Sequence, residues 1–156
     1  MKAKNINTTP IRIWLNLSYL WYTIKSSWKY YPLNCNFDCI YCYEKNERQN
    51  VTMPKDVQDK IVEFVKQQTK YVESINIGWY GGEPLLAFDV VKDISERVMN
   101  ICKEKDIMHS SFIVTNGYFL TKDISADLER LHINSAQITL DGTEDTHNKR
   151  CPLKGG

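Results

Sequence analysis

The sequence has little glycine and proline, almost no net charge and no long apolar run. Seven glycines and five prolines among 156 residues are too few for a disordered or fibrous protein. The net charge is +1 with both signs mixed along the chain, so no basic surface points to nucleic acid or to anionic lipid. We therefore expect one soluble globular domain that binds neither nucleic acid nor a membrane.

The most apolar part of the chain lies near the N-terminus, at residues 11–24. Arg12, Asn16 and Ser18 interrupt it, and no small-residue cleavage site follows. It is also shorter than the roughly 20 apolar residues that a membrane helix needs. We interpret it as a strand or helix that packs on the domain, in preference to a signal peptide or an anchor, and treat residues 1–27 as an N-terminal extension.

The five cysteines are an odd number, and three of them, Cys35, Cys39 and Cys42, fall within eight residues. This pattern is a poor disulfide framework and a good metal or redox pattern, which favours the reducing cytoplasm. Cys102 falls beside the apolar stripe of an expected helix, where a free cysteine behaves as a small hydrophobe. Cys151 is expected in a polar loop, where it could be reactive.

Apolar periodicity predicts strands that alternate with helices, and hence an α/β fold. The expected strands lie in four segments that each end in a loop or turn: residues 28–34, 74–84, 110–117 and 135–142. The expected helices are residues 52–72, capped by Thr52, residues 89–104, and residues 121–132, capped by Thr121. This order implies right-handed crossovers and a parallel sheet, with functional residues at the carboxyl ends of the strands.

The three clustered thiols suit zinc, copper(I) or an iron–sulfur cluster. A structural zinc site would need a fourth ligand nearby, and the next candidates, Cys102 and His109, lie beyond an expected helix. Three ligands on one loop can instead hold three corners of a cubane cluster and leave one iron open for a substrate or cofactor. The pattern favours the cluster and leaves zinc as the alternative.

The cysteine spacing, with Tyr41 just before the last cysteine, closely resembles the cluster loop of the radical S-adenosylmethionine (SAM) superfamily. GGEP at 81–84, TNG at 115–117 and ITLDG at 138–142 follow in the order of that family's motifs. The resemblance implies an incomplete TIM-like barrel of parallel strands with flanking helices. About four of six strand–helix units would lie in residues 28–156, the N-terminal part of a longer core without its SPASM region.

The resemblance also implies which residues hold the cofactors. Cys35, Cys39 and Cys42 would hold a 4Fe–4S cluster whose open iron takes the amino and carboxylate groups of SAM. The other candidates for cofactor binding are Tyr41 at the adenine, Gly81, Gly82 and Glu83 at the amino group, Thr139 and Arg150 at the carboxylate, and Asn116 and Asp141 at the ribose. Gly81 and Gly82 would allow close backbone approach and positive φ. Tyr41 could instead be ordinary core, and Asn116 and Asp141 could serve only as turn formers.

The resemblance implies an enzyme, an oxidoreductase in the broad sense. Its reduced cluster would cleave SAM to methionine and a 5′-deoxyadenosyl radical that abstracts a substrate hydrogen. No catalytic base is assigned, and His147 is expected to cap or solvate its loop.

Two segments, CNFDCIYCYE and TEDTHNKRCPLKGG, resemble the peptide- and protein-modifying branch of that family. This branch includes anaerobic sulfatase-maturating enzymes and SPASM-type maturases of ribosomal peptides. The implied partners are a peptide or protein substrate and an external electron donor such as a flavodoxin or ferredoxin. The alternative is a non-catalytic module with zinc or an inert cluster at the cysteine loop, or an inactive fragment.

Overall fold

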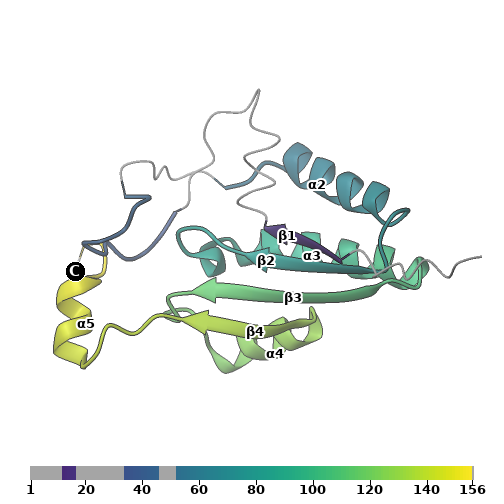
Figure 1. Cartoon of the computed structure of the whole chain (residues 1–156). Coiled ribbons are helices and arrows are strands. Elements are labelled where there is room, and N and C mark those ends of the chain that lie inside the picture. The colour runs from purple at the N-terminus through teal and green to yellow at the C-terminus, as the bar shows by residue number, and fades with distance from the viewer. Residues whose placement is uncertain (1–11, 17–33, 46–51, 156) are drawn as a thin grey trace, which may run out of the picture.

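The computed structural model describes residues 12–16, 34–45 and 52–155 and shows one parallel sheet flanked by helices (Figure 1). The sheet order is β1-β2-β3-β4. The strands are β1 Arg12–Asn16, β2 Ser74–Trp79, β3 Met108–Thr115 and β4 Ile133–Ile138. The helices are α2 Lys55–Gln68, the short 3-10 helix η1 Pro84–Ala87, α3 Phe88–Glu104, α4 Lys122–Arg130 and α5 Glu144–Arg150. The predicted parallel α/β arrangement is confirmed.

The strand beside β2 comes from the segment that we expected to be an N-terminal extension. Arg12 pairs with Ser74 and Asn16 with Gly78, so β1 extends the sheet in parallel. The strand expected at residues 28–34 lies outside the described residues, except for Asn34, which is not in a strand. Part of the expected extension therefore belongs to the sheet.

The core lies between the sheet and the helices that connect its strands. Alternate residues of β2, Ile75 and Ile77, are fully buried and pack with Ile94 and Val98 of α3. Burying an aliphatic side chain of this size stabilises a fold by roughly 1.5–3 kcal/mol. Cys102 joins this core at 1% exposure, and burial raises the pKa of its thiol to about 11, which confirms it as a small buried hydrophobe.

The two predicted helix caps have different outcomes. Thr121 caps α4 as predicted, because its hydroxyl accepts the backbone N–H of Ile124 at 3.2 Å. The prediction that Thr52 caps the preceding helix α2 was wrong, because α2 begins at Lys55 and Pro54 occupies the N-cap position. Proline has no backbone N–H and a φ of −64° there, and no side-chain cap hydrogen bond is present.

The segment after β4 is a helix, whereas we expected a loop. Thr143 stands at the N-cap of α5, Glu144 and Asp145 occupy its first turn, and Lys149 and Arg150 occupy its last turn. These charges suit the helix dipole at both ends. Within the part of the chain that the structure describes, neither α5 nor any other helix is long and apolar enough to cross a membrane.

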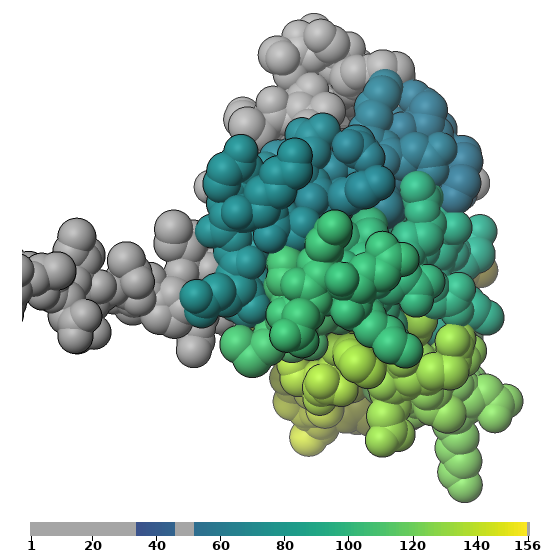
Figure 2. Space-filling view, turned by 90° about the vertical axis from the view of Figure 1, so that its right-hand side faces the viewer, coloured from purple at the N-terminus to yellow at the C-terminus, as the bar shows by residue number. Residues whose placement is uncertain are grey.

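The carboxyl ends of β2, β3 and β4 point towards the cysteine loop, residues 34–45, and towards α5 (Figure 1). The opposite end of the sheet faces the viewer in Figure 2, where successive segments follow one another from teal through green to yellow-green. Strands that follow one another in the sequence are neighbours in the sheet, as expected for consecutive strand–helix units. The residues that we expected to bind cofactors therefore gather at one edge of the sheet.

Candidate cluster and cofactor site

The cysteine loop is held by backbone pairing with the segment that follows α5. Residues 36–40 run antiparallel to residues 150–154, with a bridge between Phe37 and Leu153. The backbone hydrogen bonds are Asp38 N to Pro152 O, Ile40 N to Arg150 O, and Lys154 N to Asn36 O, each 2.8 Å. A segment distant in sequence thus fixes the course of the loop that carries the thiols.

The three thiols of the loop lie in surroundings that suit a metal centre. Cys35 is buried, and its Sγ accepts the backbone N–H of Phe37 at 3.4 Å and the Asn116 amide at 3.8 Å. Burial, a hydrogen bond to Cys151 and the charges of the neighbouring cysteines raise the pKa of Cys39 to about 12. Crowded thiolates repel one another unless a cation joins them. Soft thiolates with N–H···S hydrogen bonds fit an iron–sulfur cluster.

Glu83 joins the ends of β2 and β3. Its carboxylate is 3% exposed and accepts from Thr115 Oγ1 at 2.7 Å, Asn116 N at 2.7 Å and Leu85 N at 3.0 Å. These donors fill three of the about four lone-pair positions of a carboxylate. Sequence reasoning assigned Glu83 to the amino group of a cofactor and missed this role in joining two strand ends.

The glycine pair before Glu83 is asymmetric. Gly81 has a φ of 138°, whereas Gly82 does not have a positive φ. The expectation of positive φ is therefore correct for Gly81 and wrong for Gly82. Only Gly81 adopts a backbone conformation that a residue with a Cβ would find strained.

Asn116 at the end of β3 is hydrogen-bonded to its neighbours, whereas Thr139 at the end of β4 is exposed. The Asn116 amide donates to Asn36 Oδ1 at 2.8 Å, and its Oδ1 accepts the backbone N–H of Tyr118 at 3.0 Å. Asn116 therefore orders both its own turn and the start of the cysteine loop. Thr139 lies just beyond β4 and is exposed.

Tyr41, Asp141 and Arg150, three of the expected cofactor residues, contact one another. The Tyr41 hydroxyl donates to Asp141 Oδ2 at 2.6 Å, and the Arg150 guanidinium lies 5.1 Å from the centre of the Tyr41 ring. Arg150 Nε also lies 3.7 Å from Asp141 Oδ1. The hydrogen bond raises the pKa of Tyr41 and lowers the pKa of Asp141. The Arg150 guanidinium therefore lies over the Tyr41 ring in a cation–π contact. The contact of Tyr41 with an adenine remains a prediction.

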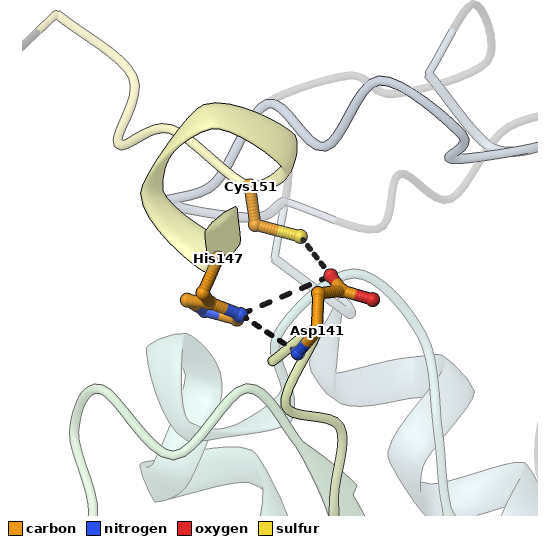
Figure 3. A group of neighbouring side chains, drawn as sticks. All are labelled: Asp141, His147 and Cys151. Carbon is orange, nitrogen blue, oxygen red and sulfur yellow. Dashed lines mark hydrogen bonds and ion pairs between the residues drawn. The ribbon is translucent and has the colours of Figure 1, made fainter. Parts of the chain in front are cut away.

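Cys151 and His147 complete a group that sequence reasoning missed (Figure 3). The expectation of a polar loop around Cys151 was wrong, since its side chain is 5% exposed and packs with Cys35 and Cys39. Its Sγ donates to Asp141 Oδ2 at 3.4 Å, and His147 Nδ1 accepts from Asp141 N at 3.3 Å. His147 thus caps the loop as predicted. The available signal was the order of charges, acidic at Glu144 and Asp145 and basic at Lys149 and Arg150, which suits a helix. In a helix, residues 147 and 151 lie on one face.

A family model of the radical SAM superfamily matches residues 31–155. The chain belongs to this superfamily. Its members use a 4Fe–4S cluster and SAM, so both expected cofactors are confirmed at the level of the family.

Curated relatives of the chain catalyse different reactions. It is 35% identical over 129 residues to a GTP 3′,8-cyclase of Campylobacter jejuni, which covers 77% of the chain and 36% of that enzyme. It is 25% identical over 142 residues to the radical SAM cyclopropyl synthase TigE of Paramaledivibacter caminithermalis, covering 73% of the chain and 29% of TigE. The chain therefore spans about a third of the length of these relatives.

Solved structures confirm the fold. Native anSMEcpe with bound AdoMet (SAM) and Kp18Cys peptide matches with a TM-score of 0.65 and 20% identity, over 78% of this chain and 33% of that chain. BtrN in complex with AdoMet and 2-DOIA matches with a TM-score of 0.52 and 24% identity, over 76% of this chain and 46% of that chain. The partial TIM-like barrel expected from the sequence is thus present.

Proposed function

We propose that this chain is the cofactor-binding part of a radical SAM enzyme of the SPASM-type branch, which modifies a peptide or protein. The observation that carries the proposal is the contact of the cysteine loop with the end of β3, where Asn116 donates to the Cys35 sulfur. The backbone N–H of Phe37 donates to the same sulfur, and the charges of Cys35 and Cys42 act on the nearby Cys39 thiol. Residues 28–156 would form the N-terminal part of the core.

Each residue of the site has a role that follows from its contacts. The three cysteines would hold the cluster, which when bound supplies the electron that cleaves SAM and starts radical chemistry. Asn116 donates to the Cys35 sulfur and would stabilise its thiolate form. Glu83 holds the ends of β2 and β3 at a fixed separation.

The other expected cofactor residues lie around these strand ends. The turn at Gly81 and Gly82 and the exposed hydroxyl of Thr139 would contact the methionyl part of SAM. Arg150 and Asp141 form a charged pair beside Tyr41, from which the guanidinium could reach a carboxylate. A cytoplasmic location and an electron donor such as a flavodoxin or ferredoxin are part of the proposal, because a reduced cluster needs both a reducing environment and a source of electrons.

A peptide substrate is supported by the likeness to anSMEcpe, whose solved structure contains a peptide. A nucleotide substrate is the second candidate, because the GTP 3′,8-cyclase of Limosilactobacillus fermentum is 37% identical over 106 residues. Adding GTP, or a set of cysteine- and serine-containing peptides, to the reconstituted chain separates the two candidates. We expect peptides and not GTP to increase the formation of 5′-deoxyadenosine, and the reverse result would favour the cyclase reaction.

The cofactor assignment is tested by anaerobic reconstitution with iron and sulfide, followed by dithionite and SAM. We expect about four irons per chain and formation of 5′-deoxyadenosine. Cys39→Ala should lose the cluster, whereas the matched control Cys102→Ala, in the core, should retain it. A wild-type chain that binds no iron, or a Cys39→Ala chain that keeps four, would contradict the assignment. Iron without cleavage of SAM would restrict the proposal to cluster binding.

A further inference from the structure

We propose that Asp141, His147 and Cys151 bind one divalent ion of the zinc class, at a site distinct from the three-cysteine loop (Figure 3). This proposal uses none of the three expected cluster ligands, and it shares Asp141 with the residues expected to bind SAM. The three side chains come from the loop after β4 and from α5, and they point towards one another.

The separations of the ligand atoms match those around a tetrahedral zinc ion. Zinc bonds of about 2.0–2.3 Å place neighbouring ligand atoms about 3.3–3.8 Å apart. Here Cys151 Sγ lies 3.4 Å and His147 Nδ1 lies 3.8 Å from Asp141 Oδ2. All three ligand atoms lie within 4.8 Å of one another. Only a small closing movement would bring them around one ion.

The local fold fixes the positions of the three residues. His147 and Cys151 are four residues apart, and the backbone N–H of Cys151 donates to His147 O at 2.7 Å, which closes the last turn of α5. Side chains four apart in a helix lie one above the other. Asp141 reaches them from the end of β4, where Gly142 turns the chain into α5 with a φ of 110°. The three side chains therefore lie close together before any ion binds.

The hydrogen bonds among the three side chains show what an ion would displace. His147 Nδ1 accepts the backbone N–H of Asp141, and the same lone pair would leave that hydrogen bond to coordinate an ion. Asp141 Oδ2 accepts from Tyr41 and keeps a second lone pair for an ion. The Cys151 thiol points its proton at the same oxygen. Binding would replace that proton, which passes to solvent, by the ion.

The chemistry of the donors selects zinc among the common divalent ions. One thiolate, one imidazole and one carboxylate form a mixed set that zinc accepts, whereas magnesium and calcium prefer oxygen alone. The thiolate and the carboxylate together balance the two positive charges. Cys151 is buried, while the side chains of Asp141 and His147 are 15% and 18% exposed, so solvent reaches two of the three ligands.

The nearby cluster ligands make a clean test necessary, because Cys39 packs against Cys151. The variant C35S/C39S/C42S removes the loop thiols and leaves the proposed site intact. Its zinc affinity is measured under anaerobic conditions by competition with a chromophoric chelator. We expect one zinc per chain, with at least a tenfold loss of affinity on adding His147→Ala or Cys151→Ser and no change on adding Cys102→Ala.

Cobalt(II) gives a second readout, since a thiolate–cobalt absorption band should appear in the triple variant and disappear with Cys151→Ser. Zinc binding that is missing from a triple variant with wild-type helical circular dichroism, or that is unchanged by both single substitutions, would overturn the proposal. If the triple variant does not fold, the reconstituted wild-type chain is used. It should then contain one zinc beside its iron, and His147→Ala should remove the zinc and keep the iron. Loss of iron with retention of the zinc would overturn the proposal.

Discussion

The carboxylate of Glu83 accepts the backbone N–H of Asn116 at 2.7 Å and thereby ties the turn after β2 to the end of β3. The other carboxylate oxygen accepts the Thr115 hydroxyl and the N–H of Leu85. A single buried side chain thus fixes the relative position of two strand ends that face the cysteine loop.

Replacing Glu83 by Gln should therefore destabilise the fold. The amide keeps one acceptor oxygen and places an NH₂ group against donors, so buried hydrogen bonds are lost at a cost of about 1–3 kcal/mol. Urea unfolding at pH 7 measures the change. The control is Glu96→Gln, which removes an exposed ion pair with Arg130 and should cost less than about 1 kcal/mol. Equal effects of the two substitutions would show that the buried network carries no extra stability.

Asn116 should stabilise the cluster once it is bound. Its amide donates to the Cys35 sulfur and to Asn36, so Asn116→Ala removes an N–H···S contact and loosens the start of the loop. Residues that hydrogen-bond to metal ligands typically change metal affinity by about 10–100-fold. We expect faster loss of iron to a chelator from the reconstituted variant. Asn134→Ala, on the exposed face of β4, is the control and should lose iron at the wild-type rate.

The sequence predicted those parts of the structure that depend on local patterns. The alternation of Ile75 and Ile77 identified β2, and the Thr121 hydroxyl marked the start of α4, because each signal acts within a few residues. The cysteine spacing and the strand-end motifs located the candidate site for the same reason. The prediction of Thr52 as a cap was wrong because α2 begins three residues later, at Lys55, with Pro54 at the N-cap position.

The rest depends on contacts between distant segments. Cys151 lies beside Cys39 only because residues 150–154 pair with residues 36–40, and no local pattern reports such pairing. The partners of Glu83 likewise come from the next strand along the sheet. The pairing of β1 with β2 joins segments that are separated by α2. The sequence therefore indicated that residues 11–24 are apolar, and it did not indicate where they lie in the sheet.

The free energy of unfolding should fall as the pH is lowered from about 6.5 to about 4, the range in which His109 stays neutral in the folded chain. Burial, together with the nearby charge of His132, lowers the pKa of His109 to about 4, below the value of about 6.5 in an unfolded chain. Between these values the unfolded chain binds the proton and the folded chain does not, so acid favours unfolding there. The effect is fully developed at about pH 4 and is lost above about pH 6.5.

Urea unfolding of the wild-type chain at pH 7 and pH 5 checks this expectation. After allowance for the partial exposure of the imidazole, we expect His109 to account for about 1 kcal/mol of the loss. His109→Gln should remove that part of the difference, whereas a variant that shows the full wild-type difference would assign it to other groups. Ser111→Ala is the control for the hydrogen bond between Ser111 Oγ and His109 Nε2, since it leaves the imidazole in place.

Gly81 and Gly82 should respond differently to alanine, although they are adjacent in one motif. A Cβ at Gly81 would be strained, because its φ of 138° lies in the region that favours glycine, and strain of this kind costs about 1–3 kcal/mol. Gly82 does not have a positive φ, so alanine there should change stability by less. Thermal unfolding of Gly81→Ala and Gly82→Ala measures both, and each variant is the control for the other. A larger loss for Gly82→Ala would mean that close packing rather than backbone conformation explains the pair. The expected order would instead show that the turn before Glu83 needs its first glycine for φ, which keeps the Glu83 carboxylate in reach of Thr115 and Asn116.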